Sequence, residues 1–550
     1  MCGIFAYLAT STGKISQQKT ENLELQNYKI KHRGPDNTKT LLVDDQLWFG
    51  FHRLAINGLD HDSDEPITFK NMVLICNGEI YNYLDLQKKY EFDLQTHNDC
   101  EVIIHLFLRF GFEQTVKMLD GVFSIILYDT EFKDLYVAND PIGIRPLFYG
   151  TTSEGDMVFA SEPISLVDIC ENVQYFPPGH YEIWKKNFKA WETTRVQYYK
   201  YDWSDRFHPT DITLPEIYGN YRKFLTKAVE KRLLGERPFA CLLSGGLDSS
   251  LISCITAKLL KERGLGPLNT FSIGLKNSPD LEYARKVSNS IGSIHHEVVV
   301  SESEFLDAIP EVIKAIQSFD VTTVRASCGN YLIAKYISEE TEFKIILNGD
   351  VSEEIHSSYF YSKFAQSPTD FYNDNVRLLK EVHRYDVLRS ARCMEHFGLE
   401  CRTPFADKDL IDFVMRIRPE FKQFGVDKMF PMEKALMRLS FSNDLISDAC
   451  WRPKMAFSDG VSKKTRSWHE IIAEHVNKIW SDKNHSEFLL RDIKCGVKPK
   501  CFSKEASYYR MLFDRTLGFR QDCRDLIKEY WMPRFIDAKD PSARAIGSEK

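Results

Sequence analysis

The sequence predicts two domains of different fold class: an α+β antiparallel sandwich, followed by an α/β domain with a parallel sheet and helices on both faces. Three observations predict this. The chain has 550 residues, which is too many for one hydrophobic core. Residues 1–200 contain mostly short apolar or alternating runs separated by turn residues. From about residue 215 onward, strand-like and helix-like runs alternate.

In the first half, the expected strands cover residues 4–8, 72–76, 122–128, 135–138 and 157–160. Residues 100–110 carry apolar side chains at helical spacing and are expected to form a helix. The aromatic and charged residues 191–208 are expected to bridge to the second domain. We therefore expect the first domain to span residues 1–205.

In the second half, strands are expected at 239–243, 270–275, 296–300 and 344–347, and helices at 251–261, 281–290 and 305–317. This alternation is typical of a parallel sheet that is covered by helices on both faces. The second domain is expected to span residues 206–535. Residues 536–550 form a polar tail that is expected to be loose.

The composition argues against two classes of partner. The net charge is -7 with both signs interspersed, so no basic stripe indicates nucleic acid. No apolar run approaches the roughly 20 residues that span a bilayer, so we expect no membrane segment. The 13 cysteines are scattered without a Cys-x-x-Cys pair. That pattern favours free thiols in a reducing compartment, so we expect a cytoplasmic protein.

Cys2 is a candidate nucleophile. If Met1 is removed, Cys2 carries both its thiol and a free α-amine. An α-amine has a reference pKa of about 8, so it can serve as the base that activates the thiol. The alternative interpretation is a small apolar residue that enters the first strand.

Three further segments of the first half carry polar groups. Arg53 follows an apolar run. Its guanidinium either makes a bidentate hydrogen bond to a carboxylate or lies on the surface. Cys76-Asn77-Gly78-Glu79 ends an expected strand, and its Asn-Gly pair forms either an oxyanion hole or a plain hairpin turn. Asp99 precedes the expected helix, either as a cap or as a carboxylate for a substrate ammonium. His32-Arg33-Gly34-Pro35-Asp36 is a polar turn.

Residues 243–250 read Leu-Ser-Gly-Gly-Leu-Asp-Ser-Ser and lie between an expected strand and an expected helix. Gly245 and Gly246 let the backbone approach a phosphate, serine hydroxyls donate to it, and the helix points its positive end at it. Asp248 can hold magnesium. No Gly-Lys-Ser/Thr follows, so pyrophosphate-releasing chemistry fits better than a Walker-type site. The alternative is a capped glycine turn.

These segments occur in one order along the chain, and together they resemble glutamine-hydrolysing asparagine synthetases. Further matches are residues 278–280, 319–327, 402–405, 451–454 and 540–547, so the resemblance covers nearly the whole chain.

The resemblance implies a first domain of the αββα, N-terminal-nucleophile type. There Cys2 would attack the glutamine side-chain amide and form a thioester, and Asn77 and Gly78 would stabilise the oxyanion. Arg53 would bind the glutamine carboxylate, and Asp99 with Glu79 the α-amine.

The second domain resembles PP-loop ATP pyrophosphatases. There aspartate would attack the α-phosphate of ATP to give β-aspartyl-AMP and pyrophosphate, and ammonia arriving through an internal tunnel would displace AMP. Asp248 and Glu353 would hold Mg²⁺, and Asp350, Lys454 and Arg325 would be catalytic. The implied ATP-binding residues are Leu243, Ser244, Gly245, Gly246, Asp248, Ser249, Ile273 and Gly349. Members of the family are often homodimers, so the resemblance is also compatible with a homodimer.

One loop departs from the family pattern, which reads Ser-Gly-Glu-Gly-Ser-Asp-Glu-(Val or Leu)-Phe-Gly-Gly-Tyr. Here residues 348–359 read Asn-Gly-Asp-Val-Ser-Glu-Glu-Ile-His-Ser-Ser-Tyr. Asp350 replaces the glutamate expected to act as base on ammonia, and Glu353 replaces the aspartate expected to hold magnesium. Val351, Ser357 and Ser358 stand where glycines are expected. Asn139 stands where the family commonly has arginine. We expect ATP binding to persist and turnover to be slower than in the family.

Three hypotheses follow from the sequence. The leading one is a glutamine-dependent asparagine synthetase, with glutamine, aspartate and ATP as substrates. A second is a glutaminase or a regulatory ATP-binding paralogue with a weakened synthetase site. A third is a related amidotransferase with another acceptor, such as a β-lactam synthetase, which the presence of Cys2 disfavours.

Overall fold

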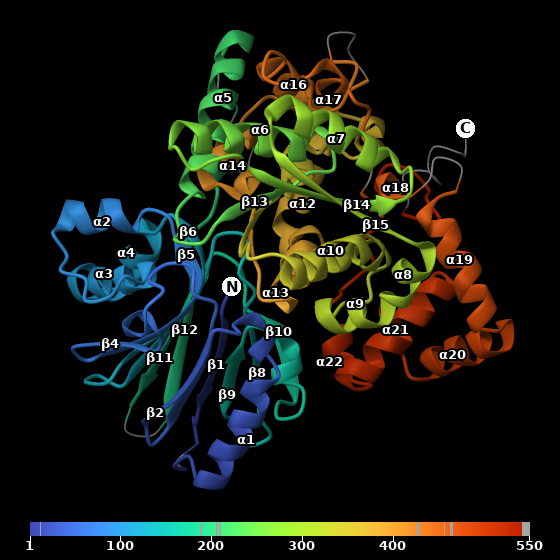
Figure 1. The fold of residues 1–550 in the computed structure, drawn as a ribbon. Helices are drawn as coiled ribbons and strands as arrows, with labels where there is room; N and C mark the ends of the chain where they lie inside the picture. The colour runs from blue at the N-terminus through green and yellow to red at the C-terminus, as the bar shows by residue number, and fades with distance from the viewer. Residues whose placement is uncertain are drawn as a thin grey trace.

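The structure is a computed structural model that describes all residues except 12, 188–189, 205–206, 208, 210, 426–429, 456, 463–465 and 542–550, and the side chains of 458–459. Two six-stranded antiparallel sheets form the first domain (Figure 1). One has the strand order β10-β8-β9-β1-β3-β2 and the other the order β12-β11-β7-β6-β5-β4. Their bounds are β1 Gly3–Leu8, β2 Asn37–Asp44, β3 Leu47–Arg53, β4 Ile67–Phe69, β5 Met72–Ile80, β6 Gly121–Asp129, β7 Asp134–Asn139, β8 Phe148–Thr151, β9 Met157–Ala160, β10 Asn172–Tyr175, β11 His180–Lys186 and β12 Trp191–Gln197.

Helices cover the outer faces of both sheets. Strand β1 is buried along its whole length because Ile4, Ala6 and Leu8 face the second sheet, whereas Phe5 and Tyr7 pack in the same cluster as Leu23 of α1 (Gln17–Tyr28). The outer face of the second sheet packs against α2 (Tyr83–Tyr90), α3 (Val102–Phe110) and α4 (Phe112–Met118). These four layers confirm the αββα sandwich that the sequence predicted.

A five-stranded parallel sheet forms the centre of the second domain, with the order β15-β14-β13-β16-β17. Its strands are β13 Phe239–Leu242, β14 Asn269–Leu275, β15 Ile294–Val300, β16 Ile345–Leu347 and β17 Glu400–Arg402. Cys241 and Leu347 pack in a cluster with Leu251 and Ile252 of α6 (Leu247–Glu262). Ala240 and Ile346, their neighbours in sequence, pack in a cluster with Ile333 of α10 (Val321–Glu340). Helices on both faces are therefore confirmed, as Figure 1 shows.

The remaining helices surround this sheet and extend toward the C-terminus. They are α5 Leu214–Lys231, α7 Pro279–Ile291, α8 Glu302–Asp307, α9 Ile309–Ile316, α11 Ser352–His356, α12 Pro368–Glu381, α13 Asp386–His396, α14 Lys408–Met415, α15 Pro419–Lys422, α16 Ala435–Ser440, α17 Ser447–Cys450, α18 Phe457–Gly460, α19 Trp468–Ile479, α20 Asp482–Lys494, α21 Lys504–Leu517 and α22 Gln521–Arg524. No helix among the described residues is both long and apolar enough to cross a membrane.

The structure corrects the predicted elements in three places. Asn77 and Gly78 form no turn; they continue β5, because β6 pairs with β5 through Ser124 and Phe123. Residues 191–197, expected to bridge the domains, form the edge strand β12. The single helix expected at 305–317 is divided into α8 and α9, with Pro310 in the first turn of α9, where its missing N–H is tolerated.

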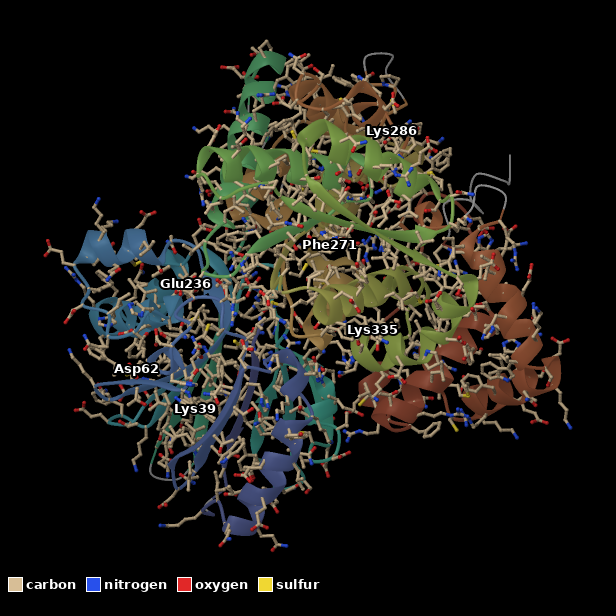
Figure 2. All side chains as sticks on the ribbon, viewed as in Figure 1. Lys39, Asp62, Glu236, Phe271, Lys286 and Lys335 are labelled. Atoms are coloured by element: carbon tan, nitrogen blue, oxygen red, sulfur yellow. The ribbon has the colours of Figure 1, made fainter. Side chains whose placement is uncertain are left out.

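The two domains contact each other, and Figure 2 labels Glu236 on the second domain where they meet. There Glu236 of the second domain accepts a hydrogen bond from the Gly58 backbone N–H of the first at 2.7 Å. The predicted boundary at 205/206 falls on residues outside the described part of the chain, so it remains a prediction. In the predicted loose tail, Asp540 is ion-paired with Arg325, and residues 542–550 lie outside the described part.

Candidate active sites

Cys2 lies at the entrance to β1, at the junction of the two domains. Its Sγ–H donates to the Leu54 carbonyl at 3.8 Å, and its own carbonyl accepts from Arg33 Nε at 3.1 Å. Burial raises the pKa of the Cys2 thiol to about 12. Met1 precedes it, and its buried ammonium lies 3.9 Å from Glu400 Oε2. While Met1 is attached, the nitrogen of Cys2 is an amide and cannot act as a base.

Asn77 is suited to bind a ligand. It is 1% exposed, and neither its Nδ2 nor its Oδ1 has a hydrogen-bond partner among the described residues. A buried polar group without a partner costs about 1–3 kcal/mol, which a bound substrate oxygen would recover. Gly78 follows it in the same strand.

Two buried carboxylates lie together near this strand. Asn57 Nδ2 donates to Glu79 Oε2 at 2.9 Å and to Asp99 Oδ1 at 3.3 Å. Burial raises the pKa of Asp99 to about 6, and burial together with Glu400 raises that of Glu79 well above its usual value. A substrate ammonium would lower both values and so be held by the pair.

The Arg53 guanidinium is hydrogen-bonded to residues of the loop that follows it in the chain. Its guanidinium donates to Asp64 Oδ1 at 2.5 Å, to the Asp60 carbonyl at 2.7 Å and to the Asn57 carbonyl at 3.2 Å. Its predicted role with the glutamine carboxylate therefore remains a prediction. The sequence placed Arg402 in a matched segment but gave it no role; it lies in β17 of the second domain and donates to Glu79 Oε2 at 2.9 Å.

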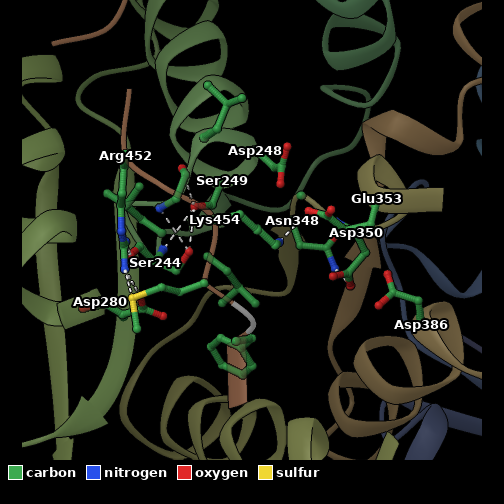
Figure 3. Close-up of a pocket in the computed structure, with 18 of the residues that line it drawn as sticks. Ser244, Asp248, Ser249, Asp280, Asn348, Asp350, Glu353, Asp386, Arg452 and Lys454 are labelled. Atoms are coloured by element: carbon green, nitrogen blue, oxygen red, sulfur yellow. Dashed lines mark hydrogen bonds and ion pairs between the residues drawn. The ribbon is translucent and has the colours of Figure 1, made fainter. Parts of the chain in front are cut away.

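The second site is a pocket at the carboxyl ends of the parallel strands (Figure 3). It lies between the loops that follow β13 and β16, where the strand order reverses direction and where open α/β sheets bind ligands. Seven of the eight predicted ATP-binding residues line it: Leu243, Ser244, Gly246, Asp248, Ser249, Ile273 and Gly349. The eighth, Gly245, serves the turn instead: its φ is +70°, and a Cβ there would lie 2.5 Å from the Tyr283 and Ala284 backbone.

The loop before α6 is held open toward the pocket. The Ser244 N–H donates to Ser249 Oγ at 3.2 Å, and the two hydroxyl groups lie 3.0 Å apart. Arg452, which also lines the pocket, donates from Nη1 to the Ser244 carbonyl at 3.0 Å. The positive N-terminus of the 16-residue α6 therefore points into the pocket beside fixed hydroxyl donors.

The two predicted magnesium ligands converge on one ammonium. Lys434 Nζ lies 2.8 and 2.7 Å from the two oxygens of Asp248 and 2.5 Å from Glu353 Oε1, which also binds Lys454 Nζ at 2.5 Å. Burial would raise the pKa of Glu353, but the two lysines outweigh it and hold this pKa well below its usual range. Carboxylates that share one cation in this way fit Mg²⁺, which needs only one or two of them when phosphates supply other oxygens.

Asp350 also lines the pocket. Its Oδ2 accepts from Asn348 Nδ2 at 2.5 Å, and its Oδ1 lies 3.4 Å from Arg389 Nη2. Burial and the neighbouring Asp386 raise the pKa of Asp350 to about 6. A carboxyl group with that pKa can accept a proton near neutral pH.

The structure does not bring Arg325 to the pocket. Its guanidinium forms paired contacts with Glu505 at 2.6–2.8 Å and with Asp540 at 2.8 Å. Its predicted catalytic role remains a prediction. Sequence reasoning missed Lys434, Asp386 and Arg389, which line the pocket from helices or loops without a recognisable motif. The i, i+3 spacing of Asp386 and Arg389 was the available signal.

Comparisons with known proteins cover both halves of the chain. A family described as "Glutamine amidotransferase domain" matches residues 1–176, and one described as "Asparagine synthase" matches residues 220–374 and 367–495. An asparagine synthetase [glutamine-hydrolyzing] of Gallus gallus is 39% identical over 575 residues, covering 99% of this chain and 98% of its own length. The proteins of the same description from Mus musculus and Homo sapiens are 39% and 38% identical over 573 residues, with the same coverage. The chain belongs to the glutamine-hydrolysing asparagine synthetase family.

Proposed function

We propose that this protein synthesises asparagine from aspartate and ATP, with ammonia released from glutamine. The observation that carries the proposal is the joint construction of the two sites. Arg402 from the parallel sheet reaches Glu79 in the glutamine site, while the pocket at the ends of the same sheet carries the phosphate-binding loop. A free-standing glutaminase would not need this contact.

In the first site, the proposed reaction starts with removal of Met1. The α-amine of Cys2 then takes the thiol proton, and Sγ attacks the glutamine amide carbon. Asn77 Nδ2 donates to the oxyanion, and Asp99 and Glu79 hold the α-ammonium of glutamine. The protonated α-amine of Cys2 then returns the proton to the amide nitrogen, the C–N bond breaks, and ammonia leaves a thioester on Sγ. Water then hydrolyses the thioester to release glutamate. Loss of Met1 also removes a side chain that packs with Leu54 and Ile56 at the junction.

In the second site, an aspartate carboxylate oxygen attacks the α-phosphorus of ATP, and pyrophosphate leaves. We propose that Lys434 and Lys454 then pair with the departing phosphates. Asp248 and Glu353 would hold Mg²⁺, which supplies further charge compensation when bound. Ammonia displaces AMP from the β-aspartyl-AMP carbonyl, and Asp350 accepts the proton that the attacking nitrogen loses.

Ammonia has to cross from one site to the other without being protonated. The junction offers an apolar environment: Leu54, Ile56 and Val122 of the first domain share one buried cluster with Ile345 and Phe405 of the second. Bulk water at pH 7 would convert most ammonia to ammonium, which is no nucleophile. We propose that the path runs through this cluster.

The aspartate itself requires groups for an α-ammonium and an α-carboxylate. We propose Asp386 and Arg389 for these roles, because both line the pocket next to Asp350. The location in a reducing cytoplasm is supported by the 13 cysteines, which are free in the structure. The homodimer that the resemblance admits can be tested by the mass of the protein in solution.

The test is the transfer of ¹⁵N from the glutamine amide to aspartate, run with and without ATP. Labelled asparagine, AMP and pyrophosphate in equal amounts are the expected result. Glutamate release without asparagine would refute the proposal. It would favour the second candidate, a glutaminase or a paralogue with a weakened second site, for which the exchanged carboxylates Asp350 and Glu353 are the reason.

A further inference from the structure

Arg33 joins the nucleophile to the second domain. Its Nε donates to the Cys2 carbonyl at 3.1 Å, its Nη1 donates to Glu162 Oε1 at 2.9 Å, and the same Nη1 pairs with Glu395 Oε2. The side chains of Arg33, Glu162 and Glu395 are 0%, 1% and 0% exposed. Water therefore does not replace any of these contacts.

Glu395 is the member of this cluster that comes from the second domain and points to Arg33. It lies one residue before the end of α13. Its Oε2 binds Arg33, and its Oε1 has no hydrogen-bond partner among the described residues. If Glu395 served only to stabilise its own helix, both of its carboxylate oxygens would be expected to accept hydrogen bonds. Here the described hydrogen bonding of Glu395 is directed at the residue that holds Cys2.

The charges around Arg33 balance only when Glu395 is counted. Glu162 is also 3.3 Å from Arg392 Nη1 and receives hydrogen bonds from His32 and Gln317. With Glu395, two guanidinium groups face two carboxylates. Without it, Glu162 alone would have to satisfy both, and Arg33 would be drawn toward Glu162 and away from the Cys2 carbonyl.

The other end of α13 borders the nucleotide pocket. Asp386, its first residue, and Arg389 both line that pocket, and Arg389 lies 3.4 Å from Asp350. Nine residues of helix separate Asp386 from Glu395, about 14 Å at 1.5 Å per residue. Figure 1 shows α13 at the junction of the domains, beside the N-terminus. One rigid element therefore contacts both sites.

We propose that Glu395 is a positioning residue that fixes Cys2 through Arg33 and ties the nucleophile to the helix bordering the nucleotide pocket. The inference rests on the proposed function. Once Met1 is removed, Cys2 is anchored by a single peptide bond. The Arg33 contact to its carbonyl then sets the direction of the thiol.

The test compares E395Q, which keeps the shape and loses the charge, with E395D, which keeps the charge. In E395Q the kcat of glutamine hydrolysis should fall about 10- to 100-fold, as expected for a misplacement of about 1 Å. The KM for glutamine and the rate of ammonia-dependent asparagine synthesis should stay within about twofold. E395D should recover part of kcat. The rate at which iodoacetamide alkylates Cys2 should differ between E395Q and the parent. This measurement does not depend on glutamine turnover.

Three results would overturn the proposal: a parental kcat together with a parental alkylation rate in E395Q, a rise in KM without a fall in kcat, or equal loss of ammonia-dependent synthesis. A separate experiment tests the link between Glu395 and the nucleotide pocket. ATP with aspartate should change glutaminase kcat in the parent and leave it unchanged in E395Q, and the same ratio in both proteins overturns the link. A parent protein that hydrolyses no glutamine would refute the proposed function instead.

Discussion

Val351 adopts a backbone conformation that suits glycine. Its φ is 71° and its ψ is -13°, and it is 0% exposed at the start of α11. A β-branched residue in the left-handed region is a clear outlier, and the family pattern has glycine here. The side chain is buried, so two effects compete when it is shortened. Comparing V351A with V351G separates them.

Both variants lose most of the buried valine side chain, so both should be less stable than the parent. They differ in backbone strain. Alanine keeps the left-handed strain of about 1–2 kcal/mol, whereas glycine removes it. Glycine in turn loses about 0.4–1 kcal/mol through the greater freedom of the unfolded chain. Taken at the middle of both ranges, the difference leaves V351G about 0.8 kcal/mol more stable than V351A, the reverse of the usual order.

The assay is thermal unfolding of both variants under one set of conditions, with the order of the two midpoints as the readout. Val414 provides the matched control, because it is also 0% exposed but lies inside α14. There the usual order should hold, with V414A more stable than V414G by about 1 kcal/mol. If V351A unfolds at the higher temperature, the strain assigned to Val351 is wrong.

Four further outcomes are expected. Cys2→Ala should abolish glutamine use and spare ammonia-dependent synthesis, and loss of both activities would contradict separate sites. Lys434→Met leaves Asp248 without its buried cation and Glu353 with Lys454 alone, so it should cost about 3 kcal/mol or more and weaken ATP binding. The comparison for this same prediction is Lys454→Met, at a site 36% exposed, which should cost less than about 1 kcal/mol. Because the pKa of Asp350 is raised to about 6, its charged form is lost as pH falls through 6, so synthesis at constant free ammonia should fall there. Asp350→Glu should raise the rate of amide formation about tenfold, and an unchanged rate would show that the shorter side chain is not limiting.

Local patterns predicted the phosphate-binding loop and the strands β1, β5, β6, β7, β9 and β13–β16, about half of the strands in the described part of the chain. The apolar runs at 122–128 and 345–347 lie in β6 and β16. Strands β2, β11 and β12 were missed because their outer residues are polar or charged and form no clear alternation. Asn77-Gly78 was assigned to a turn because the pair is a strong turn signal, and only pairing with β6 overrides it.

Residues that act through tertiary contacts could not be found from the sequence. Lys434 and Glu395 lie in segments without a motif, and Arg402 lies in the matched segment 402–405, where nothing in the sequence points to its partner. The roles of all three depend on chain partners 81 to 362 residues away. Arg325 shows the opposite problem. It stands in a segment that matches the family, but the structure pairs its guanidinium with Glu505 and Asp540.

The exchanged carboxylates at 350 and 353 have different consequences for the two chemical steps. Glu353 is longer than the aspartate of the family, and its Oε1 still reaches the lysine that Asp248 binds. The pair needed for a metal and for the phosphates is therefore intact. Asp350 is shorter than the glutamate of the family by about 1.5 Å, the length of one C–C bond, and is held back by Asn348 and Arg389. Its oxygen would lie farther from an incoming ammonia. We therefore expect the exchange at 350 to slow amide formation rather than adenylation.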